Sequence, residues 1–106
     1  MAQNIAHLTD SNFQQTIAKG LVLVDFHATW CGPCKMMEPV VEKLATEMEG
    51  KARVVKVDID EAQQTASSLQ ITSVPTLILF KDGKEVKRVV GVKDLDFLRT
   101  LVQSHG

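Results

Sequence analysis

The chain has 106 residues, of which 44% are hydrophobic and 24% charged, and its formal net charge is −1. This length predicts one domain, residues 1–106, around a single core. The nearly balanced charge provides no basic surface for nucleic acid, and no run of about eighteen apolar residues could span a membrane. Residues 1–4 lack the basic and apolar segments of a secretory signal, and the chain has only two cysteines. These features favour the reducing cytoplasm, and we expect a monomer.

The first predicted elements are an edge strand at residues 5–8 and a helix that ends at Gly20. Ser11 and Gln14 have the spacing of a capping box at the start of this helix. Two apolar residues would share its buried face: Phe13 and Ile17.

The central part of the chain predicts a strand, a long helix and a second strand. Residues 21–26 form a nearly continuous apolar run, which is typical of a strand covered on both faces. The helix would begin near the cysteines and continue to Glu49, and Pro39 would kink it without ending it. Its apolar stripe would consist of Met37, Val41, Leu44 and Met48. Because a β-branched strand follows at residues 54–58, a right-handed crossover would make the two strands parallel.

The last part of the chain predicts a short helix, a hairpin and a final helix. Asp60 would cap the short helix. The Asp-Gly pair at 82–83 stands between two predicted strands, residues 76–80 and 86–90, and predicts a hairpin. Asp94 would open the final helix, whose apolar face would consist of Leu98, Leu101 and Val102. The order βαβαβ followed by ββα predicts an α/β fold with a central mixed sheet and helices on both faces.

The two cysteines, Cys31 and Cys34, are separated by two residues at a predicted strand-to-helix junction. Thiols at this spacing can form and open a disulfide with little backbone movement, which favours reversible redox chemistry. Such pairs also occur in structural zinc sites, but these need four ligands. The sequence has no second pair, and its histidines are scattered at positions 7, 27 and 105. We therefore favour redox chemistry and expect no metal.

The start of the long helix predicts different roles for the two cysteines. Unpaired amides and the helix dipole favour negative charge there, so Cys31 would form the thiolate that attacks a substrate disulfide. Cys34, one turn further along and more deeply buried, would resolve the mixed disulfide. Between them, Gly32 would let another backbone approach closely, and Pro33 suits the first turn of a helix.

These motifs closely resemble those of the thioredoxins. The resemblance is carried by Trp-Cys-Gly-Pro-Cys-Lys at 30–35, Val-Asp-Phe at 24–26, Val-Pro-Thr at 74–76 and Gly91, and it covers nearly the whole chain. It implies a single domain with the thioredoxin fold and a protein-disulfide reductase. A thioredoxin reductase would recharge the protein, and disulfide-containing client proteins would be its substrates. No bound cofactor is implied, because electrons would pass through the cysteines themselves.

Asp25 lies inside the predicted central strand, where burial would raise the pKa of its carboxyl. The resemblance gives this position a buried acid that accepts the proton of Cys34. The alternative is an acid at the strand edge that reaches water. Lys56 matches a family lysine that tunes the charge of Asp25, although a solvent-facing lysine would also fit the alternating strand.

The resemblance also implies a surface on which substrates dock. The bond between Val74 and Pro75 would be cis and would face the cysteines, which leaves the backbone of Val74 free to pair with an extended substrate. The docking surface would consist of Trp30, Gly32, Pro33, Val74, Val90 and Gly91. As alternatives, Trp30 would be an ordinary core residue and Gly91 a turn glycine.

His27 departs from the family pattern, which often has an aromatic residue at this position. It would pack beside the site helix as a spacer. Alternatively, its cation would favour the Cys31 thiolate in mildly acidic conditions.

Two other functions compete with that of a reductase. A disulfide oxidant or isomerase would use the same chemistry, but the Gly-Pro pair between the cysteines resembles the reducing members of the family. A non-catalytic interaction subunit would use the docking surface alone. Intact Cys31, Cys34 and Asp25 argue against that as the only role.

Overall fold

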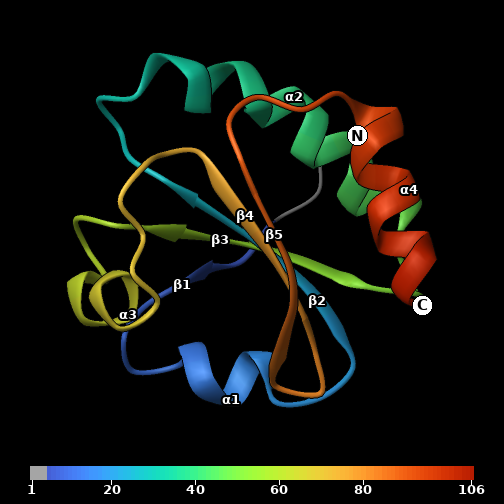
Figure 1. Ribbon diagram of the computed structural model, residues 1–106, viewed down its shortest axis with the longest axis horizontal. Coiled ribbons are helices and arrows are strands. Elements are labelled where there is room, and N and C mark those ends of the chain that lie inside the picture. The colour runs from blue at the N-terminus through green and yellow to red at the C-terminus, as the bar shows by residue number, and fades with distance from the viewer. Residues whose placement is uncertain (1–4) are drawn as a thin grey trace.

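The computed structural model describes residues 5–106 (Figure 1). Residues 1–4 lie outside this range, and so does the prediction that they carry no secretory signal. The described part of the chain forms a five-stranded sheet in the order β1-β3-β2-β4-β5. The strands are β1 (His7–Leu8), β2 (Leu21–His27), β3 (Arg53–Asp58), β4 (Thr76–Lys81) and β5 (Lys84–Val90). β1 and β2 both run parallel to β3, whereas β4 is antiparallel to β2 and to β5. The predicted mixed sheet, the edge strand and the hairpin are confirmed.

Helices cover both faces of this sheet (Figure 1). Within residues 5–106 they are α1 (Phe13–Ile17), α2 (Gly32–Glu47), α3 (Gln63–Ser68) and α4 (Leu95–His105). The core on one face joins α2 and α4 to the sheet through residues such as Met37, Leu98 and Leu23. The core on the other face contains Phe13 of α1 and Val24. The predicted α/β fold class is therefore confirmed.

β2 is the central strand, and its residues decide what lies beneath α2. Successive side chains of a strand point to opposite faces, and residues 22–26 are buried. Leu23 packs in the core under α2 and α4, whereas Val24 packs in the opposite core. Asp25 is two residues beyond Leu23, so its side chain points to the same face of the sheet, the one that α2 covers. The end of β2 delivers the chain directly to the cysteines at the start of α2.

Two predicted helix caps are wrong. The residue before α1 is Asn12, which makes no side-chain cap; its Oδ1 instead accepts a hydrogen bond from the N–H of Thr9 at 2.7 Å. α3 begins at Gln63, beyond the reach of an Asp60 cap. Instead, α3 is capped by Asp10, which is distant in the sequence. Its Oδ1 accepts hydrogen bonds from Thr65 N–H and Thr65 Oγ1 at 2.8 and 2.7 Å. These bonds lower the pKa of Asp10.

The other predicted helix boundaries are close to those in the structure. α2 continues on both sides of Pro39, and its stripe of Met37, Val41 and Leu44 is buried. It ends at Glu47, slightly before the predicted Glu49, because the chain then turns. Asp94 caps α4, as predicted: its Oδ1 accepts a hydrogen bond from the N–H of Phe97 at 2.8 Å.

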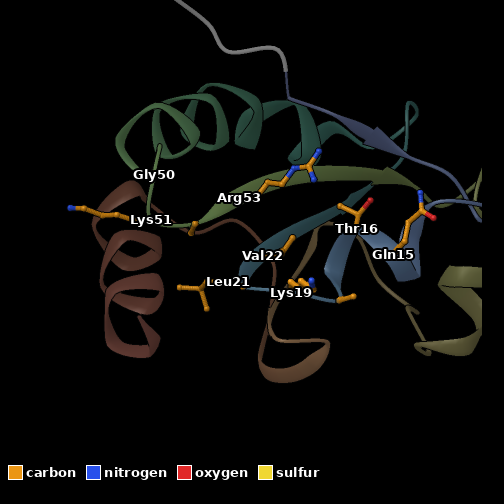
Figure 2. A pocket seen from close by; sticks show the side chains of 11 residues that line it. Gln15, Thr16, Lys19, Leu21, Val22, Gly50, Lys51 and Arg53 are labelled. Atoms are coloured by element: carbon orange, nitrogen blue, oxygen red, sulfur yellow. The ribbon is translucent and has the colours of Figure 1, made fainter.

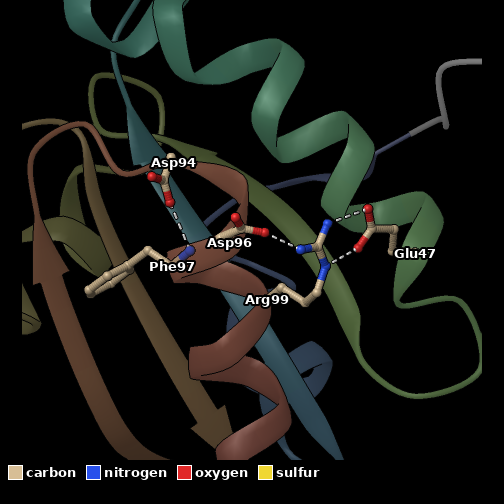
Figure 3. A network of polar contacts seen from close by, with 5 residues as sticks. All are labelled: Glu47, Asp94, Asp96, Phe97 and Arg99. Carbon is tan, nitrogen blue, oxygen red and sulfur yellow. Dashed lines mark hydrogen bonds and ion pairs between the residues drawn. The ribbon is translucent and has the colours of Figure 1, made fainter.

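An ionic contact joins α4 to the end of α2. The guanidinium of Arg99 donates to both carboxylate oxygens of Glu47, at 2.7 and 2.9 Å, and also contacts Asp96 (Figure 3). Bidentate bonds of this kind fix the geometry of two groups more strongly than a single bond does. The contact therefore helps to hold α2, which carries the cysteines, in place over the sheet.

Candidate active site

A disulfide between Cys31 and Cys34 lies where β2 passes into α2, and its Cα atoms are 5.3 Å apart. Cys31 is the N-cap residue of α2. The backbone N–H of Cys34 donates to Cys31 Sγ at 3.1 Å. An amide that points at this sulfur stabilises negative charge on it once the disulfide is open. Cys31 thus has the surroundings of a reactive thiolate.

The two cysteines do not differ in burial, so the expectation that Cys34 is the more deeply buried is wrong. Each residue is 4% exposed. The disulfide draws both side chains into one small apolar group with Ala28, against which Ile59 and Val74 pack. The hydrogen bond from the N–H of Cys34 is one contact that Cys31 Sγ makes and Cys34 Sγ does not.

Val74 and Gly91 bring two further segments to the disulfide. The Val74–Pro75 bond is cis, as the resemblance implies. The carbonyl oxygen of Val74 lies 3.7 Å from Cys31 Sγ, and the carbonyl of Pro75 accepts a hydrogen bond from the N–H of Gly91 at 2.9 Å. Gly91 has a φ of +96°, which is the conformation of a turn glycine. Segments far apart in the sequence are therefore joined beside the cysteines.

Much of the predicted docking surface is exposed. Trp30 is 66% exposed and Val90 52% exposed, so the alternative of Trp30 as a core residue is wrong. The indole Nε1 of Trp30 donates to Asp60 Oδ2 at 2.9 Å, which fixes the ring at the surface. Gly32 and Pro33 are exposed as well. A Cβ added to Gly32 would meet nothing within 4 Å, so the space above it is open.

The sequence reasoning missed several residues around this surface. Met36 and Val92 are exposed apolar residues that directly follow Lys35 and Gly91. Their position next to these two motifs could have predicted that they belong to the surface. Glu38 was also missed, since its contact with the sheet is long-range. The Sδ of Met37 accepts a hydrogen bond from the N–H of Lys93 at 3.3 Å and so links α2 to the segment after Gly91.

Asp25 is buried on the face of β2 that α2 covers. The residue is 1% exposed, so the alternative of an acid that reaches water is wrong. Its Oδ1 has no hydrogen-bond partner among residues 5–106. Burial raises the pKa of Asp25 to about 6, Lys56 opposes this rise, and Glu38 adds to it. A carboxyl with this pKa can take up and release a proton near neutral pH.

Lys56 lies beside Asp25 in the sheet, because the two residues are register partners on β3 and β2. Its side chain is only 11% exposed, and its Nζ lies 3.9 Å from Glu38 Oε2. A solvent-facing lysine does not fit these observations. The ammonium lowers the pKa of Asp25, which is the effect that the resemblance implies.

His27 lies at the end of β2 with its ring against that of His7, at a centroid distance of 5.9 Å. Its Nε2 is buried and has no hydrogen-bond partner among the described residues. Burial is the largest cause of a lowered pKa, and the ammonium of Lys56 adds to it. The neutral ring therefore fits the spacer role. A role for the cation in acidic conditions stays a prediction.

A hollow of about 630 Å³ lies at the opposite end of β2 from the cysteines (Figure 2). Residues such as Lys19, Leu21 and Arg53 line it, and it includes none of the predicted site residues. Within residues 5–106, no group of three or more His, Cys, Asp or Glu residues could hold a metal ion. None of the helices in that range has the length and apolar character needed to cross a lipid bilayer.

The chemistry that this site supports is exchange between its own disulfide and the thiols or disulfides of another molecule. The fold and the site therefore define a thiol–disulfide oxidoreductase.

The chain belongs to the thioredoxin family, because the family model described as Thioredoxin matches residues 4–104. The chain is 50% identical over 101 residues to a thioredoxin of Staphylococcus saprophyticus, covering 95% of this chain and 97% of the relative. It is 53% identical over 98 residues to a thioredoxin of Chlamydia trachomatis, covering 92% and 95%. A solved mutant thioredoxin from Halobacterium salinarum superposes with a TM-score of 0.85 at 44% identity, covering 93% of this chain and 88% of the other.

Family membership establishes the activity of the chain. It is a protein-disulfide reductase that carries electrons through the Cys31–Cys34 pair, without a bound cofactor. Thioredoxins generally work with a thioredoxin reductase and with disulfide-containing client proteins.

Proposed function

We propose that Cys31 is the nucleophile of this reductase and that Cys34 resolves the intermediate. The Cys31 thiolate attacks a sulfur of the client disulfide, so that a mixed disulfide forms and one client thiolate leaves. The Cys34 thiolate then attacks Cys31 Sγ, which closes the Cys31–Cys34 disulfide and releases the second client thiolate. Two electrons pass from the dithiol to the client. The observation that carries this proposal is the N–H of Cys34 pointing at Cys31 Sγ, 3.1 Å away.

In this proposal, Asp25 accepts the proton of Cys34 as that thiol attacks. A base is most effective when its pKa lies near the working pH, and the pKa of Asp25 is raised to about 6. The carboxyl is therefore largely ionised at neutral pH and still basic enough to bind a proton. Lys56 moderates this basicity from the neighbouring strand.

The client would dock across the surface formed by Trp30, Gly32, Pro33, Val74, Val90 and Gly91. Because the carbonyl of Val74 lies 3.7 Å from Cys31 Sγ, an extended client segment paired with this backbone would have its disulfide within reach of Cys31. Trp30 and Val90 offer exposed apolar contacts on the same surface. Large apolar residues often dominate the energy of such interfaces.

We further propose that a thioredoxin reductase recharges the Cys31–Cys34 disulfide of this chain and that the chain acts in the cytoplasm as a monomer. Family membership supports the first point. The small number of cysteines supports a reducing compartment.

A charge placed on the docking surface tests this proposal. In Val90→Asp, we expect KM for thioredoxin reductase and for insulin to rise about tenfold, because a desolvated carboxylate weakens an apolar interface by roughly 1.4 kcal/mol or more. Reduction of a small aromatic disulfide, which needs no docking surface, should be unchanged. Steady-state kinetics with both kinds of substrate measure this.

The matched control is Val86→Asp, on the same strand but facing the hollow beside α4. It should leave all the KM values near those of the wild type. Equal effects of Val86→Asp and Val90→Asp, or no effect of the latter, would place client docking elsewhere.

A further inference from the structure

Lys56 stands between two carboxylates that come from different elements. Asp25 is its register partner on β2, and Glu38 on α2 lies 3.9 Å from its Nζ. The two carboxylates differ sharply in environment, since Asp25 is 1% exposed and the side chain of Glu38 is 54% exposed. One ammonium is therefore shared between a buried base and a carboxylate near water.

Among residues 5–106, Glu38 is the one carboxylate that lies within ion-pair distance of the Lys56 ammonium. Oδ1 of Asp25 accepts no hydrogen bond from any residue in the range 5–106, whereas Glu38 forms an ion pair with Lys56. A direct bond from Lys56 to Asp25 would stabilise the ionised carboxylate and make it a poor base. The attraction between the Lys56 ammonium and Glu38 opposes the formation of such a bond.

We propose that Glu38 is a positioning residue for the proton acceptor: its carboxylate holds the Lys56 ammonium toward α2 and so keeps the buried Asp25 carboxylate basic. The functional importance of this arrangement rests on the proposed role of Asp25, but the arrangement itself can be tested without it.

Glu38 also acts on Asp25 directly through its own charge, beside the proposed effect through Lys56. Burial is the largest cause of the raised pKa of Asp25, Lys56 lowers that pKa, and Glu38 raises it. On the β4 side, the register partner of Asp25 is the apolar Leu77. His27 of β2 is affected by the same two charges, Lys56 and Glu38, and also by His7 of β1 and Asp58 of β3. Because His7 and His27 are themselves titratable, their resonances have to be followed together with that of Asp25.

The test is a carboxyl NMR titration of Asp25 in the oxidised protein, where neither cysteine titrates. In Glu38→Gln, we expect the ratio of ionised to neutral Asp25 at pH 6 to rise about threefold, which corresponds to roughly half a pH unit in its midpoint. Glu42→Gln removes a charge one turn further along the same helix and should leave the ratio unchanged. A Glu38→Gln titration that coincides with that of the wild type would overturn the proposal.

A double-variant cycle separates positioning from a direct effect of the Glu38 charge. In the Lys56→Met background, Asp25 should be harder to ionise. Adding Glu38→Gln to this background should change the ratio of ionised to neutral Asp25 much less than it does in the wild type. Equal changes in the two backgrounds would show that Glu38 acts on Asp25 only directly, which would contradict the positioning role. The resonances of His7 and His27 in the same spectra show whether either imidazole accounts for the shift.

The kinetic consequence is tested on the release of a client from its mixed disulfide with Cys31. In Glu38→Gln, the acid limb of the pH–rate profile should move to lower pH, and Glu42→Gln should retain the wild-type profile. If Asp25→Asn leaves this profile unchanged, the proposed role of Asp25 fails, whereas the NMR cycle still decides the role of Glu38.

Discussion

Cys34→Ser is expected to stop turnover while Cys31 still captures clients. The variant keeps the amide that points at Cys31 Sγ but lacks the thiol that would release the mixed disulfide. Insulin reduction should fall by about a thousandfold or more, the scale on which enzymes lose activity when a covalent catalytic group is removed. At the same time, a stoichiometric client adduct should appear on Cys31. Intact-protein mass spectrometry before and after treatment with a reductant measures the adduct.

Cys31→Ser is the matched control, since it should be equally inactive without accumulating an adduct. Because the two cysteines are equally buried, a difference in adduct formation between the two variants would reflect the amides at the start of α2 and not a difference in exposure. Stable adducts on Cys34 in Cys31→Ser, with none on Cys31 in Cys34→Ser, would reverse the proposed roles.

Asp25→Asn is expected to stabilise the protein at neutral pH and to slow client release. Folding raises the pKa of Asp25 from 3.8 to about 6, which corresponds to roughly 3 kcal/mol of destabilisation when the carboxyl is ionised. Between about pH 4 and pH 6, the folded state binds more protons than the unfolded state does. This contribution to stability therefore falls as pH rises through that window and stays constant above it. The variant should lack this decline.

Urea unfolding of wild type and Asp25→Asn at several values between pH 4 and pH 8 measures this difference. The exposed Glu61 provides the control, since Glu61→Gln should retain the wild-type pH dependence. Identical pH dependence in wild type and Asp25→Asn would mean that folding does not raise the pKa of Asp25. Client release at pH 7 should slow in Asp25→Asn because no carboxylate remains to accept the Cys34 proton.

The sequence predicted the parts of the site that are local. The spacing of Cys31 and Cys34, their place at a helix start, and the hairpin at 82–83 follow from residues close together in the chain. The segment at Val74 and Gly91 was predicted from the family resemblance, and the structure places it beside Cys31.

What the sequence could not predict depends on contacts between distant residues. The Asp10 cap on α3 joins positions 55 apart in the chain, so a local search for a cap selected Asp60 instead. The register that sets Lys56 beside Asp25 and the reach of Glu38 from α2 both require the assembled sheet. Both cysteines are 4% exposed in the closed disulfide, although their positions along the helix predicted that Cys34 would be the more deeply buried.

The most direct test of the central claim is the reduction potential of the Cys31–Cys34 couple, measured by equilibration with glutathione, together with insulin reduction by a thioredoxin reductase. We predict a potential more negative than that of the glutathione couple and insulin reduction that depends on the reductase. A strongly oxidising potential would contradict the account, because the pair would then donate disulfides to clients and not reduce them.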